Sequence, residues 1–464
     1  MTDEDKRKET VLKLRDQYLN MSVMKYNSLE PILLQELVNL IDFARANSIW
    51  WRERLKDVDT SIKSMSELVR SLPMTDRELI QNDFDNMTIQ IPGTDLNDYG
   101  LQKTSGSSSH PVQVLKYWPT HSIDADAIVL MEWKWHQRDI RKKIGFFRLG
   151  AADSDHAEIG SPLSYLGQAP ETFTRASVDR TPRELLDSLF QHQPSYLLTN
   201  PISLRLIAEE QKNRPMRIAP LDQILTLADR VDDSLRELVQ EVFGAKIVDR
   251  YSSVEFGMIA LQCPKHNHLH VIAPNVYVEV VDENDQPVPI GTPGRILITS
   301  LHGFAMPLFR YEQGDIVTMG HSCDSGITWP VIESVHGRVR TYTDGPDGSR
   351  RLLTLFTADF LLMREILDFR VIKFDEEVVF IAQTREPLDA AAKERITKSM
   401  EDVFRRVLPI RIVETIETLS RPTWKAKEIY VVPGTPEANW DISDFHKVLD
   451  DSDQESINLS ENSP

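Results

Sequence analysis

Apolar and polar positions alternate in different ways along the chain and divide it into segments. Over residues 10–90 apolar residues recur at three- and four-residue spacing, which predicts helices. Residues 112–118 (VQVLKYW) alternate and contain β-branched side chains, which indicates a strand. From 182 to 250 helical stretches alternate with short apolar runs, the pattern of βα units. Residues 276–282 and 294–301 are expected to form strands joined by a Gly/Pro/Asp-rich turn.

The section after Gly337 has a smaller pattern of its own. Two apolar runs flank an acidic turn and predict a hairpin over 370–384. The segment 387–408 begins with proline and keeps its apolar residues on one face, which predicts an amphipathic helix. A further strand, RIVETIETL, follows it. We therefore expect a compact ββαβ unit that forms a separate small domain.

Composition narrows the class of protein. The chain has 464 residues, with 41% apolar and 27% charged residues, so it should fold around a large core. A formal charge of −18 makes nucleic acids and anionic membranes poor partners. Only two cysteines, Cys263 and Cys323, are present, which excludes a disulfide framework. The N-terminal segment lacks the apolar stretch of a secretory signal, and we expect a cytoplasmic protein without a membrane-spanning helix.

A hydroxyl-rich segment lies directly before the strand at 112–118. Its sequence, TSGSSS, places five hydroxyl groups around one glycine. Backbone N–H groups of such a loop can surround an anion, and the hydroxyls add donors to phosphate oxygens. A serine-rich loop can equally be an ordinary turn or linker, and no Gly-Lys-Ser/Thr ends it as in a Walker loop. The candidate phosphate-binding residues are Thr104, Ser105, Gly106, Ser107 and Ser108.

Further motifs follow this loop in a fixed order. They are YSSVEFG at 251–257, RYEQGD at 310–315, the pair Gly337-Arg338, and Lys427 beyond the last expected strand. In order and spacing the chain resembles the adenylate-forming ligase superfamily, in the branch typified by phenylacetate–CoA ligase, from about residue 20 to about residue 432. The resemblance implies an ATP-dependent ligase. Such an enzyme activates a carboxylic acid as acyl-AMP, releases pyrophosphate and transfers the acyl group to a thiol or an amine.

The resemblance also implies a multidomain α/β fold. Residues 1–337 would form a large N-terminal adenylate-forming domain with βα units and mixed sheets. Residues 338–434 would form a small mobile α+β lid domain that carries the catalytic lysine. Residues 435–464, which are rich in acidic side chains, are expected to form a disordered tail.

Roles at the nucleotide follow from the resemblance. Glu255 would hold Mg²⁺ against the phosphates of ATP. Tyr251, Ser252 and Ser253 would line the ATP and AMP site, although Tyr251 could also be an ordinary core aromatic. Asp315 would accept hydrogen bonds from both ribose hydroxyls, because a carboxylate offers two oxygens to two neighbouring donors.

Two basic residues complete the implied catalytic set with Glu255. Arg338 would lie near the ribose or the phosphate and mark the domain boundary. Lys427 would stabilise charge between the substrate carboxylate and the α-phosphate, with Lys425 as a rival two residues away. Several family glycines are replaced here, for example by Ala426, which motivates the alternative of a degenerate homologue that binds a nucleotide or a partner without turnover.

A metal site and an acyl pocket remain open at this stage. Cys263, His270, His321 and Cys323 could supply four tetrahedral ligands to a structural zinc ion, as in relatives, or they could be free thiols beside a His-rich loop. On the expected helix before residue 137, Trp133, Trp135 and His136 could face an aromatic acid or belong to the core. The acceptor could be coenzyme A, a carrier protein or an amine.

Overall fold

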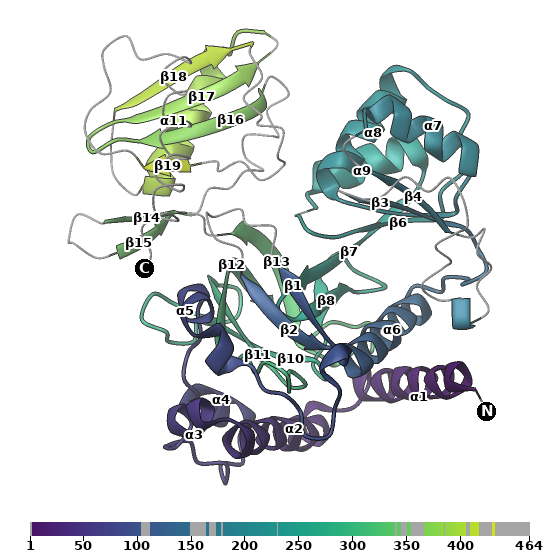
Figure 1. The fold of residues 1–464 in the computed structure, drawn as a ribbon. Coiled ribbons are helices and arrows are strands. Elements are labelled where there is room, and N and C mark those ends of the chain that lie inside the picture. Colours follow the sequence, from purple (N-terminus) through teal and green to yellow (C-terminus); the bar gives the residue numbers. More distant parts are fainter. Residues whose placement is uncertain are drawn as a thin grey trace. The chain divides into compact units, whose positions relative to one another are not determined.

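The computed structural model divides into two compact units, which are considered separately (Figure 1). The first unit extends to His336 and the second begins at Gly337. The structure describes residues 2–103, 112–148, 164–166, 173–177, 180–229, 231–338, 341–344, 350–353, 366–384, 386–404, 409–416 and 429–431.

Helices form the N-terminal part of the first unit, as the apolar spacing predicts. Helix α2 buries one stripe of side chains, Leu29, Leu33, Leu37, Leu40, Ile41 and Ala44. The side chain of Thr2 caps α1 in a reciprocal capping box with Asp5, and Asp76 caps α5. The helices are α1 (Asp3–Ser22), α2 (Tyr26–Asn47), α3 (Ile49–Arg54), α4 (Met65–Ser71) and α5 (Arg77–Met87).

A short hairpin flanks the hydroxyl-rich segment. Strand β1 (Tyr99–Lys103) pairs antiparallel with β2 (Gln113–Tyr117), and Lys103 lies opposite Gln113. The two described ends of the segment are therefore held side by side. Helix α6 (Trp118–Trp135) starts directly after β2, with Pro119 in its first turn.

Five parallel strands form one half of the main sheet and confirm the predicted βα units. Alternate positions along a strand face opposite sides: Leu197, Ile224 and Ile247 pack against helices, whereas Leu198 and Leu225 pack with Trp133 of α6. The strands are β3 (Ile144–Arg148), β4 (Phe173–Ser177), β5 (Tyr196–Thr199), β6 (Gln223–Thr226) and β7 (Lys246–Ser253), and the helices are α7 (Pro182–His192), α8 (Pro201–Asn213) and α9 (Asp233–Phe243).

The other half of the sheet is largely antiparallel and meets the parallel half at β7. The first residues of β7 pair with β6, and the last pair with β8, so the strand direction changes at this strand. The sheet order is β10-β11-β12-β13-β9-β8-β7-β6-β5-β3-β4. The added strands are β8 (Gly257–Gln262), β9 (Leu269–Val271), β10 (Val276–Val281), β11 (Pro293–Ser300), β12 (Tyr311–Gly320) and β13 (Val331–Arg338).

A buried ion cluster fastens α6 to β7. Glu132 has no exposed side-chain surface, and it pairs with Arg138 at 3.0 Å and with Arg250. Burial alone would raise the pKa of Glu132, but the two guanidinium groups lower it to about 2. The cluster is therefore ionised at neutral pH, and it fixes β7 one residue before Tyr251.

The second unit contains the predicted hairpin, helix and strand. Phe369 and Phe380 stack at 5.3 Å between ring centres. The helix begins at Ala390 rather than at Pro387, because the Asp389 side chain accepts the backbone N–H of Ala392. The four-stranded sheet has the order β18-β17-β16-β19. Its elements are β16 (Ile366–Lys373), β17 (Val378–Thr384), α11 (Ala390–Phe404), β18 (Ile410–Thr415) and β19 (Ile429–Val431), and β14 (Thr341–Asp344) pairs with β15 (Arg350–Leu353) in a separate hairpin.

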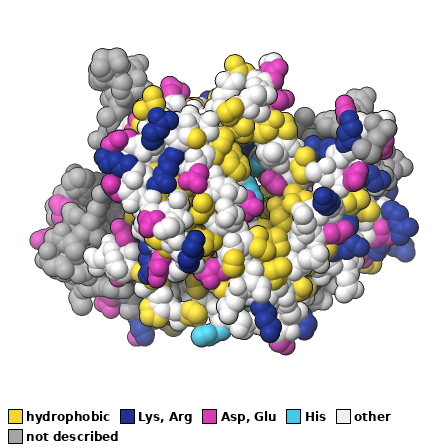
Figure 2. All heavy atoms as spheres, turned by 90° about the horizontal axis from the view of Figure 1, so that it is seen from below, with side chains coloured by type: hydrophobic (Ala, Val, Ile, Leu, Met, Phe, Trp, Pro, Cys, Tyr) yellow, Lys and Arg dark blue, Asp and Glu magenta, His cyan; other side chains and the backbone are white. Residues whose placement is uncertain are grey.

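The surface of the described residues carries charges of both signs. On the face shown in Figure 2, acidic and basic side chains are interspersed, and hydrophobic side chains gather toward the middle. None of the helices within the described ranges is long and apolar enough to cross a membrane.

Candidate active site and metal centre

The turn after β7 holds a buried carboxylate. Ser253 pairs with Gly257, so the β7–β8 turn is tight; Gly257 has φ +69°, a conformation that glycine adopts readily. The Ser253 hydroxyl accepts the backbone N–H of Phe256 and closes the turn. Glu255 lies within this turn, yet it is only 5% exposed. A carboxylate buried at a hairpin tip indicates a role beyond solubility.

The RYEQGD motif forms the start of β12. Its backbone adopts two left-handed conformations, at Arg310 (φ +43°) and Gly314 (φ +79°). The N-terminal helical region supports it, since the backbone N–H of Glu312 donates to the Thr75 carbonyl at 2.9 Å. The Arg310 guanidinium pairs with Glu279 at 3.0 Å. This strained segment places Asp315, which is 7% exposed, on β12.

Hydrogen bonds connect the two motifs crosswise. The hydroxyl of Tyr251, from the first motif, donates to Asp315 of the second at 2.5 Å. The hydroxyl of Tyr311, from the second motif, donates to Oε1 of Glu255 in the first at 3.1 Å. Both carboxylates are thereby held in fixed orientations at the strand where the sheet changes direction.

Glu255 fits the role of a magnesium ligand. Its Oε1 accepts from Tyr311, whereas its buried Oε2 has no hydrogen-bond partner among the described residues. Leaving a buried carboxylate oxygen unsatisfied is costly unless a ligand completes it. Mg²⁺ takes carboxylate oxygens as ligands in sites that also bind substrate phosphates.

A pocket opens beside Glu255. It lies between the first turns of α6, the β7–β8 turn and the loop from Ser300 to Leu308. Its apolar wall includes Leu115, Ile128, Met258, Phe304, Met306 and Leu308. Charged and titratable side chains also line it: Lys116, His121, Asp124 and His302.

The charged groups of the pocket are perturbed by burial. Lys116 donates to the backbone carbonyl oxygen of Glu255, and burial lowers its pKa to about 8 against the opposing influence of the Glu255 carboxylate. Burial, and then the charge of Lys116, lowers the pKa of His121 to about 4, so His121 is neutral at pH 7. Burial raises the pKa of Asp124, while His302 and a hydrogen bond from the Tyr18 hydroxyl act in the opposite direction.

The aromatic residues at the far end of α6 belong to the core. Trp133 is 4% exposed and packs against Tyr196, and Trp135 packs against Trp329. His136 bonds to the carbonyl oxygen of Gln262. The core alternative that the sequence left open is therefore the one the structure favours, since the pocket is lined by the opposite end of α6.

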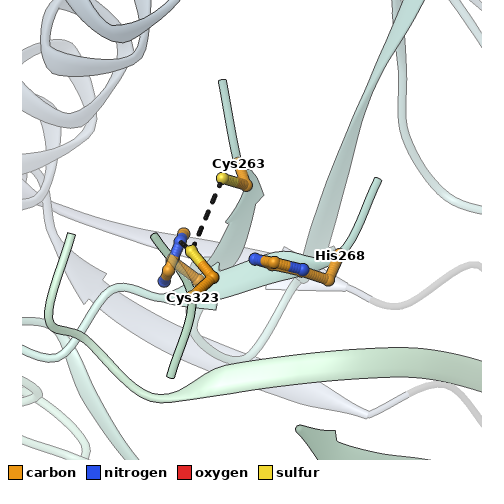
Figure 3. Close-up of side chains that lie close together, drawn as sticks. Cys263, His268 and Cys323 are labelled. Carbon is orange, nitrogen blue, oxygen red and sulfur yellow. Dashed lines mark hydrogen bonds between the residues drawn. The ribbon is translucent and has the colours of Figure 1, made fainter. Parts of the chain in front are cut away.

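Two cysteines and two histidines form a separate cluster that could hold a metal. Possible ligand atoms of Cys263, His268, His270 and Cys323 all lie within 4.8 Å of one another. Figure 3 shows Cys263 and Cys323 facing each other with the His268 ring beside them. Their sulfur atoms are 3.9 Å apart, and Cys323 Sγ lies 3.5 Å from His270 Nε2. Zinc–sulfur and zinc–nitrogen bonds of ordinary length in a tetrahedral site place these pairs about 3.8 Å and about 3.6 Å apart.

The protonation of the cluster also suits a metal. Burial lowers the pKa of His270 to about 4 and also lowers the pKa of His268, so both rings favour the neutral form that a metal ion requires. His270 Nδ1 lies 3.1 Å from the Trp329 carbonyl oxygen, which directs Nε2 toward Cys323. Buried free thiols would need no such arrangement.

One expected metal ligand is corrected. His321 is exposed and lies outside the cluster, and His268 occupies the fourth position. The reason is strand geometry: His268 and His270 stand two residues apart at the start of β9, where alternate side chains point to the same side.

Comparisons with known proteins concern the fold. No protein-family model matches the chain, and no curated protein matches it in sequence. A structure of 2-hydroxyisobutyryl-CoA ligase in the postadenylation state, in complex with R3-HIB-AMP, has a TM-score of 0.69 at 15% identity and covers 94% of both chains. An open conformation of that ligase with 2-HIB-AMP and CoA has a TM-score of 0.64 at 16% identity, covering 88% of this chain and 93% of that chain. The chain has the two-domain fold of the adenylate-forming ligases.

A third structure with this fold is more distant. Anthranilate CoA ligase in complex with anthranoyl-AMP has a TM-score of 0.50 at 15% identity, covering 79% of this chain and 70% of that chain. Tyr251, Glu255 and Asp315, which the sequence predicts as site residues, all lie in the first unit. Ser252 and Ser253 lie on the same end of β7 and are partly exposed.

Part of the expected site lies outside the described residues. This applies to Lys427, to its rival Lys425, to residues 104–108 of the hydroxyl-rich loop and to the acidic tail from 435. Arg338 ends β13, and only its backbone is described.

Some residues of the pocket were not identified from sequence. Lys116, His121 and Asp124 form no motif, and only their position after the hydroxyl-rich loop and at the start of α6 hinted at a role. The sequence shows Tyr311 as part of the RYEQGD motif but does not show that it is the partner of Glu255.

Proposed function

We propose that this chain is an ATP-dependent ligase that activates a carboxylic acid as acyl-AMP with release of pyrophosphate. The observation that carries the proposal is the crossed pair of tyrosine–carboxylate hydrogen bonds. It orients Glu255 and Asp315 at the same end of β7, and one buried oxygen of Glu255 has no hydrogen-bond partner within the described ranges. A structural role alone would satisfy both oxygens of Glu255.

The residues divide the first half-reaction between them. Glu255 would hold Mg²⁺, which supplies charge neutralisation at the phosphates. Asp315 would accept both ribose hydroxyls, and Tyr251 would keep that carboxylate turned toward them. The hydroxyls of residues 104–108 would bind phosphate oxygens, with Ser252 and Ser253 at the edge of the AMP site.

Two basic residues are assigned to the charge that develops during reaction. Arg338 would bind the ribose or a phosphate. Lys427 would lie between the acid's carboxylate and the α-phosphate, where a positive charge favours the transition state over the ground state. Both assignments extend the predictions made from sequence.

The acceptor of the second half-reaction is proposed to be coenzyme A. The neighbouring 2-hydroxyisobutyryl-CoA ligase has been captured with CoA, which supports this choice over a carrier protein or an amine. We further propose that Cys263, His268, His270 and Cys323 bind a structural zinc ion. It would join the β8–β9 connection to the loop after β12, away from the chemistry.

The alternative, a degenerate homologue that binds a nucleotide without turnover, rests on replaced glycines such as Ser252. Glu255 and Asp315 would serve nucleotide binding in both cases, so the exchange assay decides between activity and this alternative.

An ATP–pyrophosphate exchange assay over a panel of carboxylic acids tests the proposal. We expect exchange with at least one acid, lowered about 100-fold or more in Lys427→Ala and Asp315→Asn. Lys425→Ala is the matched control and should retain exchange. Full exchange in Lys427→Ala would refute the role of this lysine, and a panel without exchange would favour the alternative.

A further inference from the structure

The pocket beside Glu255 contains a lysine that forms no ion pair within the described part of the chain, although the Glu255 carboxylate acts on it electrostatically. Lys116 is on β2, and its ammonium group donates to one backbone carbonyl oxygen, that of Glu255. Within the described residues no acidic side chain forms an ion pair with it. Burial disfavours the charged ammonium group, and an anion in the pocket would stabilise it.

The same pocket contains a carboxylate that lacks a strong cationic partner. Asp124 is on α6, and its Oδ1 accepts from the Tyr18 hydroxyl at 3.3 Å. His302 acts on it electrostatically, but no Lys or Arg of the described residues pairs with it. Asp124 lines the pocket, and within the described residues the Tyr18 hydroxyl is the only group that donates to its carboxylate.

Between these charges the wall is apolar. Leu115, Ile128 and Met258 line it, together with Phe304 from the opposite loop. Such a wall accepts a short hydrocarbon frame and offers it no further polar contacts. The pocket thus presents one cation, one anion and an apolar surface.

We propose that this pocket takes an amino acid, meaning a carboxylic acid that also carries an ammonium group. Lys116 Nζ holds the carboxylate beside Glu255, and Asp124 holds the ammonium group. The inference rests on the proposed function and names the class of its acid. Lys116 is then a carboxylate-binding residue of the first unit, distinct from Lys427.

Other classes of acid fit the charges less well. An acid whose only charge is its carboxylate would bring no cation to Asp124, which would keep only the Tyr18 hydroxyl and the electrostatic influence of His302; this is unfavourable for a carboxylate shielded from water. A dicarboxylic acid would bring a second negative charge close to Asp124, and the two like charges would repel each other. A hydroxy acid could donate to Asp124, but without the charge that makes the hydrogen bond strong.

Matched acids distinguish these classes on the full chain. The probes are phenylalanine against 2-methyl-3-phenylpropionate, leucine against 2,4-dimethylpentanoate, and 4-aminobutanoate against pentanoate, in which a methyl group replaces the ammonium group. We expect at least one amino acid to support ATP–pyrophosphate exchange with a kcat/KM about tenfold or more above its methyl analogue. Equal values for every pair, or a preference for the methyl analogues, would overturn the inference.

Substitutions assign the two ends of the acid. In Asp124→Asn the preference for the amino acid should fall about tenfold or more, with KM rather than kcat changed. In Lys116→Gln the KM should rise for amino acids and methyl analogues alike, and Lys116→Arg should restore part of the affinity. Asp126→Asn, whose carboxylate binds Arg7 and Tyr165 outside the pocket, is the matched control and should keep the preference.

Two further measurements keep the outcomes separate. Tyr18→Phe removes the structural hydrogen bond to Asp124, so a change of preference there would indicate a packing effect instead of recognition. Calorimetric titration with phenylalanine and its methyl analogue, without ATP, tests the pocket even in a chain that shows no exchange. If only acids other than amino acids supported ATP–pyrophosphate exchange, the proposed function would stand, but the inference that the substrate is an amino acid would be refuted.

Discussion

The hydroxyl of Tyr311 lies 3.1 Å from Oε1 of Glu255, and the second oxygen of that carboxylate has no hydrogen-bond partner in the part of the chain that the structure describes. The two residues belong to different sequence motifs and to different strands. Tyr251 makes the complementary contact to Asp315. Each motif therefore supplies one carboxylate and the hydroxyl that orients the carboxylate of the other, and neither motif can move alone without loss of a contact.

The first prediction concerns these two hydrogen bonds between a tyrosine hydroxyl and a carboxylate. In Tyr311→Phe the Glu255 carboxylate loses the one donor that the described residues offer it, so the Mg²⁺ concentration needed for half-maximal exchange should rise about tenfold or more. In Tyr251→Phe the orientation of Asp315 is lost, and the KM for ATP should rise by a similar factor. Titrations of each variant with Mg²⁺ and with ATP measure the two effects.

Each of the two variants is the control for the other. Because the two contacts are separate, Tyr311→Phe should keep a KM for ATP within about threefold of the parent. Tyr251→Phe should likewise keep a half-maximal Mg²⁺ concentration within about threefold. If both variants lost magnesium and ATP affinity equally, the crossed arrangement would be a packing feature without separate roles.

The order of motifs allowed much of the first unit to be predicted from sequence. Strand and helix periods identified the βα units and the hairpins, because each element buries one face on a continuous core. The hydrogen bonds between Tyr251 and Asp315 could not be inferred, since they depend on how β7 and β12 are placed across a sheet whose order differs from chain order. Lys116 and Asp124 belong to no motif, so only burial and the pocket identify them.

The metal cluster shows how the direction of side chains along a strand decides which histidines come together. The alternation of His268 and His270 about Leu269 was legible in the sequence as a pair on one side of a strand. His321 lies close to Cys323 in the chain, but closeness in sequence within a loop does not fix the direction of a side chain. The consequence is a second prediction with a sharp control.

That prediction concerns zinc content and stability. The purified full chain should contain about one zinc ion, and His268→Ala should lose it while His321→Ala retains it. Removal of zinc by a chelator should lower the unfolding temperature of the parent and of His321→Ala, but not that of the zinc-free variant, because the ion binds only the folded cluster. Elemental analysis and thermal unfolding measure both. Equal zinc in the two variants would exclude His268 as a ligand.

The buried cluster of Glu132 gives a prediction about folding. Glu132→Gln leaves Arg138 and Arg250 buried without a counter-charge, and it should reduce the free energy of unfolding by about 3–5 kcal/mol. Asp139→Asn, which removes a surface pair with Arg141, should leave the denaturant midpoint nearly unchanged. Chemical unfolding followed by circular dichroism measures both variants. A small effect of Glu132→Gln would mean that the pair is dispensable and that packing alone fastens α6 to β7.

The same cluster predicts how the free energy of unfolding changes at acidic pH. The pKa of Glu132 is lowered to about 2 from an ordinary 4.5, so its contribution is complete above about pH 4.5 and is lost as the pH falls toward 2. Unfolding free energies between pH 5 and pH 2.5 should therefore fall less steeply in Glu132→Gln than in the parent. Parallel slopes would place the acid sensitivity in other carboxylates.

The last prediction follows from the lowered pKa of Lys116. With a pKa of about 8 in place of 10.5, its ammonium group is present below pH 8 and lost above it. Holding a carboxylate requires the charged form, so the KM for the acid should be level near pH 7 and rise about tenfold per pH unit above 8. Glu255, His121, Asp124 and His302 also face the pocket; the carboxylate of Glu255 favours the charged lysine, and His121 is already neutral with a pKa of about 4.

Folding should respond to pH in the opposite sense over the same window. Because the folded state binds fewer protons at Lys116 than the unfolded state between pH 8 and 10.5, the free protein gains stability there while the acid loses affinity. Lys116→Met should remove both slopes together, with a KM that is high and independent of pH around 8. Steady-state KM values and denaturant midpoints from pH 6.5 to pH 10 measure the two trends, and a variant that keeps the rise in KM would assign it to a different group.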